Sequence, residues 1–194
     1  MQQPRAVRLR PTLPSSPLPV FSVRASVLSA PVLLALWLSA SALPAWANLD
    51  ARFVEGAPKD RFELTNRSAC ALANAEITVD LRTSPAGLIF DTTSTGAGVE
   101  VFQPFELVEG AQALSSHTPV NDGDTQVVMT VRSLAPGARI AFTVDVDDTI
   151  SQRGITIAGS EIEGATVRLA AGGFHASGRF TAQAETSVGS PPCR

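Results

Sequence analysis

Apolar side chains recur at every second residue over much of this chain, and this alternation limits the possible folds more than any other feature. Phe62 and Leu64 alternate with charged or polar neighbours, and Ile77 and Val79 do the same further along. A period of two is typical of strands with one buried face, and no ten-residue window shows the 3.6-residue period of an amphipathic helix. Clusters of turn-forming residues separate the segments. The sequence therefore predicts an all-β fold, a single immunoglobulin-like β-sandwich of about eight or nine strands.

Nine segments carry the alternation and are expected to be strands. They cover residues 61–65, 77–81, 99–102, 105–108, 126–131, 139–146, 155–157, 165–169 and 174–182. Pro136-Gly137 has the composition of a type II turn, in which proline fixes φ and the following glycine supplies a positive φ. This Leu-x-Pro-Gly phrase and the turn at Asn66 resemble bacterial immunoglobulin-like surface modules of the CARDB and DUF11 kind. Asn66-Arg67-Ser68 also fits the acceptor sequence for N-glycosylation.

The first 47 residues have the composition of an export signal. Four arginines and no acidic residue precede Asp50, and an uncharged, mostly apolar stretch ends in the small-residue pattern Ala45-Trp46-Ala47. We therefore expect residues 1–47 to be a basic extension and signal peptide that is cleaved. The remaining domain, residues 48–194, is then secreted to the extracellular space or the periplasm.

Two alternatives concern this leader. The uncharged stretch is long enough to cross a bilayer as an uncleaved anchor, in which case the protein contacts a membrane; Pro44 and the small residues after it favour cleavage. The proline-rich arm before Arg24 is long for a signal peptide. It also fits a transit-like extension or a start codon placed too far upstream.

Composition excludes several classes of partner. Without residues 1–47 the chain keeps all eighteen acidic residues and eleven of the fifteen basic ones, so its formal net charge is −7. Phosphate binding depends on Lys and Arg, so nucleic acid and anionic membranes are not expected partners. Both Trp residues lie in the leader and the chain has no Tyr. A sugar-stacking platform or an interface anchored by Tyr and Trp is therefore not expected.

Two cysteines, Cys70 and Cys193, remain after the leader. In an oxidising compartment the simplest expectation is one disulfide that ties an early strand to the C-terminal tail. The alternative is a free thiol or an intermolecular bridge. The position of Cys193 at the end of the chain, after two prolines, favours the alternative if the tail frays.

Three acidic residues near the end of one expected strand are the best candidate metal ligands. Asp145 and Asp147 share a strand face, and Asp148 turns toward the next loop. Calcium takes six to eight oxygen ligands, so three carboxylates with carbonyls and water could bind it. The alternative is a solvated strand end without a metal. The turn at 121–124 is also rich in oxygen ligands, but it is too short for an EF-hand loop and is typical of Asx-type turns.

No catalytic site is expected. Ser116, His175 and Asp147 supply the residue types of a hydrolytic triad, but no nucleophile-elbow sequence surrounds the serine. Two histidines, of which His117 lies in an expected loop, and two cysteines do not provide a convincing zinc ligand set. Glu161 and Glu163 could in principle act on a glycoside, which the absence of Trp and Tyr argues against.

A set of short phrases that covers nearly the whole exported part resembles a known family. The phrases are residues 57–62, 64–66, 87–91, 96–104, 122–125, 142–149 and 160–165. They are similar to exported proteobacterial proteins called "aggregation factor core", after a sponge cell-adhesion proteoglycan. The resemblance implies an adhesive or matrix role and brings no catalytic residues. The sponge system depends on calcium.

These observations predict a non-enzymatic interaction module of the adhesion type, linked to calcium, whose partner is a protein or a cell-surface or matrix component. No cofactor other than calcium is expected. The first alternative is a metal-free structural surface protein that binds its partner through an edge strand. A hydrolase is the third possibility.

Overall fold

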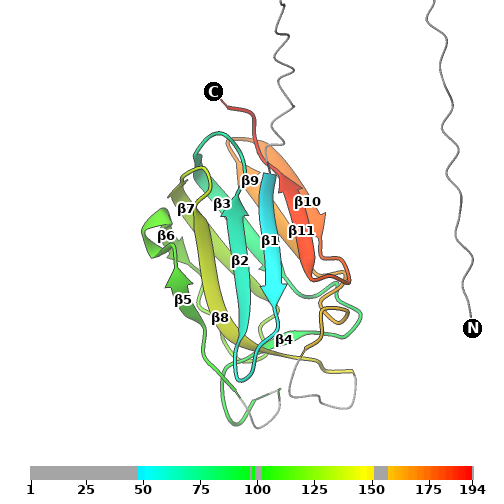
Figure 1. Cartoon of the computed structure of the whole chain (residues 1–194). Coiled ribbons are helices and arrows are strands. Elements are labelled where there is room, and N and C mark those ends of the chain that lie inside the picture. Colours follow the sequence, from blue (N-terminus) through cyan, green and yellow to red (C-terminus); the bar gives the residue numbers. More distant parts are fainter. Residues whose placement is uncertain (1–47, 97, 99–101, 151–156, 194) are drawn as a thin grey trace, which may run out of the picture. The chain divides into compact units, whose positions relative to one another are not determined.

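Two antiparallel sheets packed face to face form the molecule (Figure 1). The computed structural model describes residues 48–96, 98, 102–150 and 157–193. The first sheet has the order β11-β1-β2-β8-β4, with β5 also paired to β8, and the second has the order β10-β9-β3-β7-β6. The strands are β1 (Asn48–Val54), β2 (Asp60–Asn66), β3 (Leu72–Asp80), β4 (Ile89–Asp91), β5 (Glu106–Glu109), β6 (Leu114–His117), β7 (Gln126–Leu134), β8 (Arg139–Asp147), β9 (Thr166–Ala171), β10 (Phe174–Arg179) and β11 (Glu185–Gly189). The predicted all-β sandwich is confirmed.

The described part of the chain contains eleven strands, more than the eight or nine expected. Strands β4 and β6 have three and four residues, which is too short to establish an alternation. The expected strand at 174–182 corresponds to β10, which ends at Arg179, whereas β1 and β11 lie in segments where no strand was expected. A single turn of 3-10 helix, Ala111–Ala113, joins β5 to β6. The expected strands at 99–102 and 155–157 fall mostly outside the described residues.

The expected signal peptide, residues 1–47, also lies outside the described residues. Within the part that the structure describes, no helix has the length and apolar character that a membrane span requires.

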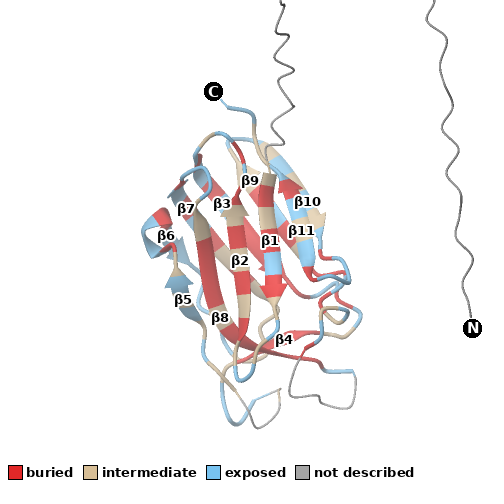
Figure 2. Cartoon of the chain, in the orientation of Figure 1, coloured by how far each residue is buried: buried red, intermediate tan, exposed pale blue. Residues whose placement is uncertain are grey.

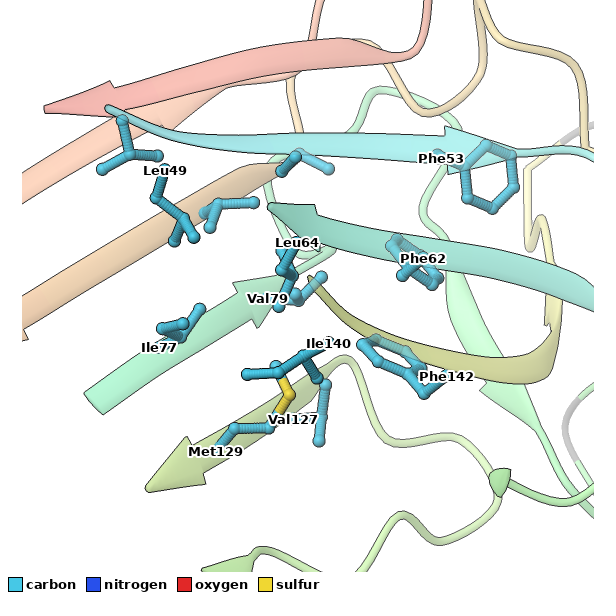
Figure 3. Packing of buried hydrophobic residues seen from close by; sticks show 14 of the residues in the cluster. Leu49, Phe53, Phe62, Leu64, Ile77, Val79, Val127, Met129, Ile140 and Phe142 are labelled. Atoms are coloured by element: carbon cyan, nitrogen blue, oxygen red, sulfur yellow. The ribbon is translucent and has the colours of Figure 1, made fainter. Parts of the chain in front are cut away.

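The core between the sheets is built from the alternating residues of both inner faces (Figure 3). Phe62 lies at its centre: its ring is 4.9 Å from that of Phe142, in a stacked arrangement, and 5.0 Å from that of Phe53. The rings of Phe90 and Phe180 meet Phe62 edge-on at 6.4 and 6.5 Å. Offset stacking and edge-to-face contacts are the favourable geometries for aromatic pairs. Phenylalanine therefore supplies the aromatic packing of a domain that lacks Trp and Tyr.

Asn66, at the end of β2, anchors the predicted type II turn. Gly137 has φ of 73°, as the third position of that turn requires, and the Ala138 N–H donates to the Ala135 carbonyl at 3.0 Å. The turn binds the backbone of Asn66, whose N–H donates to Ala138 O at 3.0 Å and whose carbonyl accepts from Gly137 N at 2.7 Å.

The side chain of Asn66 is also fully hydrogen-bonded. Its Nδ2 donates to the carbonyls of Cys70 and Leu134, both at 2.8 Å, and its Oδ1 accepts from the N–H and hydroxyl of Ser68. The residue is buried. The sequence pattern for glycosylation thus falls on an asparagine whose amide is enclosed and fully hydrogen-bonded.

The structure confirms the disulfide between Cys70 and Cys193. It joins the loop before β3 to the tail after β11, and so fixes the C-terminal segment to the second sheet. On the same side of the sandwich, β10 and β11 contact each other. A Cβ atom at Gly178 of β10 would overlap Thr186 and Ser187 of β11. Close approach of the two backbones therefore requires glycine there.

Removal of the disulfide should lower the stability of the domain substantially. The bridge spans 123 residues of sequence, for which the chain-entropy model gives about 4–5 kcal/mol as an upper value. Urea unfolding of the Cys70→Ser, Cys193→Ser double variant should show this loss beside the wild type. Reduced wild type is the matched control and should unfold at the same midpoint as the variant. Equal midpoints for oxidised and reduced wild type would contradict the expectation.

Candidate metal centre

The acidic end of β8 is inside the protein. Asp145, Asp147 and Asp148 are 4, 2 and 6% exposed. Figure 2 shows β8 buried along nearly its whole length, in contrast to β5 and β10. Val144 and Val146 belong to the hydrophobic core, and the alternation directs Asp145 and Asp147 to the opposite face. The alternative of a solvated strand end is therefore wrong, because chain outside β8 covers that face.

A third strand residue, Asp91 at the end of β4, completes a cluster with two of the predicted ligands. One carboxylate oxygen each from Asp91, Asp145 and Asp147 lies within 4.8 Å of the other two. The pairing of β4 with β8 causes this proximity, because Asp91 stands directly opposite Asp145 and Ile89 stands opposite Asp147. Asp148, the third residue predicted from the sequence, is buried nearby but is not a member of this cluster.

Two oxygens of the cluster point into the interior without a hydrogen-bond donor. These are Oδ2 of Asp91 and Oδ2 of Asp145, neither of which has a partner among the described residues. The other Asp91 oxygen accepts a long bond, 3.4 Å, from Thr93 N. Buried polar atoms are nearly always satisfied, so each exception needs a physical explanation.

Gly98 covers the cluster from the loop that follows β4. A Cβ atom at this position would overlap the carboxylate oxygens of Asp91 and Asp147. Gly96 stands in the same relation to the carboxylate of Asp122. The glycines thus allow the backbone to lie directly on the acidic side chains, which removes them from water.

Burial and mutual repulsion make the carboxylates hold protons more strongly than free aspartate does. Desolvation raises the pKa of Asp91 to about 7, and contact with the Asp122 carboxyl group and the charge of Asp147 add to it. Desolvation, with the charge of Asp147, also raises the pKa of Asp145 to about 7. Asp60, at the start of β2, has its pKa raised to about 7 by burial, against hydrogen bonds from Gly56 N and Val146 N.

Asp80 of β3 is a second buried aspartate, 2% exposed, and it has the opposite character. Arg82 donates to both of its carboxylate oxygens, and Arg168 donates to Oδ2 at 2.9 Å. Burial acts to raise the pKa of Asp80, but the hydrogen bonds from Arg82 outweigh it and hold that pKa well below its usual range. This protein therefore neutralises one buried carboxylate with arginine. Asp91 and Asp145 form no ion pair with any described basic residue.

The donor set fits a hard cation. It consists of carboxylate oxygens, without a sulfur or an imidazole nitrogen, and such sets favour calcium or magnesium over zinc or copper. Two oxygens bound to one calcium ion at about 2.3–2.6 Å can be at most about 5 Å apart, which matches the spread of the cluster.

The second acidic candidate, the turn at 121–124, is held by its own hydrogen bonds. Asp124 Oδ2 accepts from the backbone N–H of Asn121 at 2.7 Å and from its side-chain amide at 3.1 Å. Asp122 Oδ1 accepts from Thr92 N and Thr93 N at 3.0 and 3.3 Å, which ties the turn to the residues after β4. The contacts differ from those of the expected Asx-type turn, in which the side-chain oxygen accepts from the N–H two residues further on. Asp122 is placed beside Asp91.

The residues of the hypothetical triad are not brought together. Ser116 lies on β6 and His175 on β10, at opposite edges of the second sheet. Four strand spacings separate these edges, about 19 Å. Asp147 belongs to the other sheet. His117 is exposed and its ring contacts Phe105, Glu161 Oε2 accepts a hydrogen bond from Ala158 N, and Glu163 is exposed.

Asp91 was not singled out from the sequence. It follows the apolar run Leu88-Ile89-Phe90, and an acidic residue at the end of such a run is the available signal. The run is too short to indicate a strand, and its partner lies more than fifty residues further along the chain. Pairing between such distant segments cannot be read from one sequence.

Comparisons with known proteins add little. No protein-family model matches the chain, and no curated protein matches its sequence. Among solved structures, it is similar to one described as "The unique CBM- of Ruminiclostridium thermocellum", at 13% identity and a TM-score of 0.30. The match covers 75% of this chain and 99% of that one. A likeness at this level carries no information about function.

The raised pKa values of Asp60, Asp91 and Asp145 predict the pH dependence of stability without divalent cations. Their pKa is about 7 in the folded protein and about 4 in the unfolded chain, so the folded state binds more protons between these values. The free energy of unfolding should therefore fall as the pH rises from about 5 to about 8.

Urea unfolding in EDTA across this pH range measures the effect. The stability due to the ionised Asp80 is complete above the ordinary aspartate pKa and is lost only at lower pH, so it does not interfere. A midpoint that increases from pH 5 to pH 8 would contradict the expectation.

Proposed function

We propose that this protein is an exported, non-enzymatic interaction module of the adhesion type that binds calcium at Asp91, Asp145 and Asp147. Its partner is a protein or a cell-surface or matrix component, in the extracellular space or the periplasm. The observation that carries the proposal is the convergence of three buried carboxylates, two of which have an oxygen without a donor in the described part of the chain. A cation at this position would satisfy both oxygens and remove the repulsion between the three charges.

Calcium fits this site better than magnesium does. Magnesium demands nearly ideal octahedral geometry and usually keeps several of its waters. Calcium accepts irregular sets of six to eight oxygens, which suits carboxylates whose positions are dictated by strand pairing. Extracellular modules commonly bind calcium with dissociation constants of about 0.1–1 mM. An exported protein therefore does not need a site of the EF-hand type.

Four further features support an exported protein with a binding role. The sequence resembles the exported aggregation factor core proteins, and its leader has the composition of a signal peptide. The disulfide between Cys70 and Cys193 is typical of oxidising compartments. The candidate catalytic residues are far apart, with Ser116 and His175 at opposite edges of one sheet and Asp147 in the other.

The metal-free alternative, in which a partner adds to an edge strand, receives less support. On one side of the sandwich β10 and β11 contact each other. On the other side β4 and β6 are short, and the pairings of β5 and β6 contain register irregularities. Short and irregular edges are poor templates for an added strand.

Calcium should stabilise the wild-type protein against heat. At a free concentration a hundredfold above the dissociation constant, the gain is about 2.7 kcal/mol, or several degrees in the unfolding temperature. The measurement is thermal unfolding of the protein from an oxidising host, with EDTA or with millimolar calcium. Asp91→Asn should abolish the shift, whereas Asp148→Asn, the matched neighbour outside the cluster, should retain it. Retention of the shift in Asp91→Asn would refute the ligand set.

The adhesive role has a separate test. Beads coated with the wild-type protein should adhere to the surface of the producing cells, or to one another, in calcium and separate in EDTA. Beads coated with the reduced and alkylated protein serve as the control for folding. A calcium-dependent thermal shift without any adhesion would leave the metal site in place and reject the adhesive function.

A further inference from the structure

Strand β4 is the shortest of the described strands, and it pairs with the most acidic part of β8. Its three residues face Asp145, Val146 and Asp147. Like charges directly opposite each other destabilise an antiparallel pair, and the Asp91–Asp145 pair has this arrangement. Figure 1 shows β4 at the lower end of the sandwich, where β8 ends. The attachment of this edge is therefore opposed by the side chains that form it.

Burial increases this opposition. Asp91 is fully buried and Asp145 nearly so, and each has an Oδ2 atom without a donor in the described part of the chain. Asp80 provides an internal comparison, because an equally buried carboxylate there has two arginine partners. Within the described residues, the β4–β8 pair therefore has no neutralising group of the kind that Asp80 has.

The loops at this end of the sandwich are held by hydrogen bonds to β4 and to the residues after it. On the side away from β8, Phe90 N–H donates to Asp124 O at 2.8 Å and Phe90 O accepts from Gly123 N at 2.9 Å. Asp122 accepts from the two threonine N–H groups after β4. The turn at 121–124 thus binds to Phe90 of β4 and to the two residues that follow the strand. Release of β4 from β8 would release this turn as well.

We propose that a calcium ion bound by Asp91, Asp145 and Asp147 fastens β4 to β8. The ion thereby controls partner binding from inside the sandwich, and it does not itself form a bridge to the partner. This inference rests on the proposed calcium site. All three ligand side chains are at most 4% exposed, so an ion among them has no carboxylate on the surface to share with another molecule. Its effect on a partner must pass through the position of β4 and the 121–124 turn.

Hydrogen exchange of the full exported protein, followed by mass spectrometry, tests the fastening. Calcium at a hundredfold excess over its dissociation constant should slow exchange at residues 89–91, 122–124 and 145–147 by up to about a hundredfold relative to EDTA. Amides of the β9–β10 pair, in the other sheet, should change little. Equal protection throughout the sandwich, or none in these three segments despite a thermal shift, would overturn the inference.

Asp91→Asn separates fastening from metal binding. The amide has nearly the same shape as the carboxylate, removes one of the three charges and can donate to the Asp145 and Asp147 carboxylates. Exchange at residues 89–91 should therefore be slow in this variant with or without calcium. Exchange as fast as that of the wild type in EDTA would refute the proposal.

Asp80→Asn is the matched control, because it removes a carboxylate of equal burial in the other sheet. This variant should keep the wild-type calcium response at β4. A loss of that response would mean that any buried aspartate has the same effect, which contradicts the proposal.

The bead experiment completes the test. If calcium acts only by fastening β4 to β8, beads coated with the Asp91→Asn variant should adhere in EDTA as well as in calcium. If calcium bridges to the partner, the same beads should not adhere at all, which would overturn the inference. A wild-type protein that binds no calcium would reject the proposed function itself, whereas binding without an effect on β4 would reject only this inference.

Discussion

The apolar contact between the two inner sheet faces is the interaction on which every other feature of this molecule depends. Phe62 lies at its centre, surrounded by four other phenylalanine rings, and β8 runs through it from Ile140 to Val146. Because β8 continues beyond the core without leaving the interior, its last residues are buried whatever their chemistry. The acidic cluster is therefore a direct consequence of how the sheets pack.

Two ways of burying a carboxylate coexist in one small domain. Asp80 is neutralised by Arg82 from the turn after its own strand and by Arg168 from the neighbouring strand β9, and its charge contributes to stability at neutral pH. Asp91 and Asp145 have no such partner among the described residues, and protons or a cation bound there would neutralise them. In a compartment rich in calcium, a bound calcium ion would take the place of those protons. Stability of this end of the sandwich then depends on the surroundings of the protein as much as on its sequence.

The sequence predicted the sheets better than the site, for a physical reason. Alternation along β2, β3, β7 and β8 is a local property, and the type II turn at Gly137 follows from two adjacent residues. The strand β4 has only three residues, and its partner is distant in sequence. Asp145 and Asp147 could therefore be named in advance, but Asp91 could not. Asp148 was named because it is adjacent in sequence, whereas the cluster is defined by pairing across strands.

The enclosed amide of Asn66 has a practical consequence for production of the protein. Both amide hydrogens are donated to carbonyls inside the fold, so a glycan on this nitrogen and the native structure exclude each other. In hosts that glycosylate nascent chains, the Asn66-Arg67-Ser68 sequence is accessible to the glycosylating enzyme before folding buries Asn66. Modification there would trap the chain before the turn at Gly137 can dock. A bacterial periplasm that forms disulfides without attaching glycans suits this fold better than a eukaryotic secretory pathway.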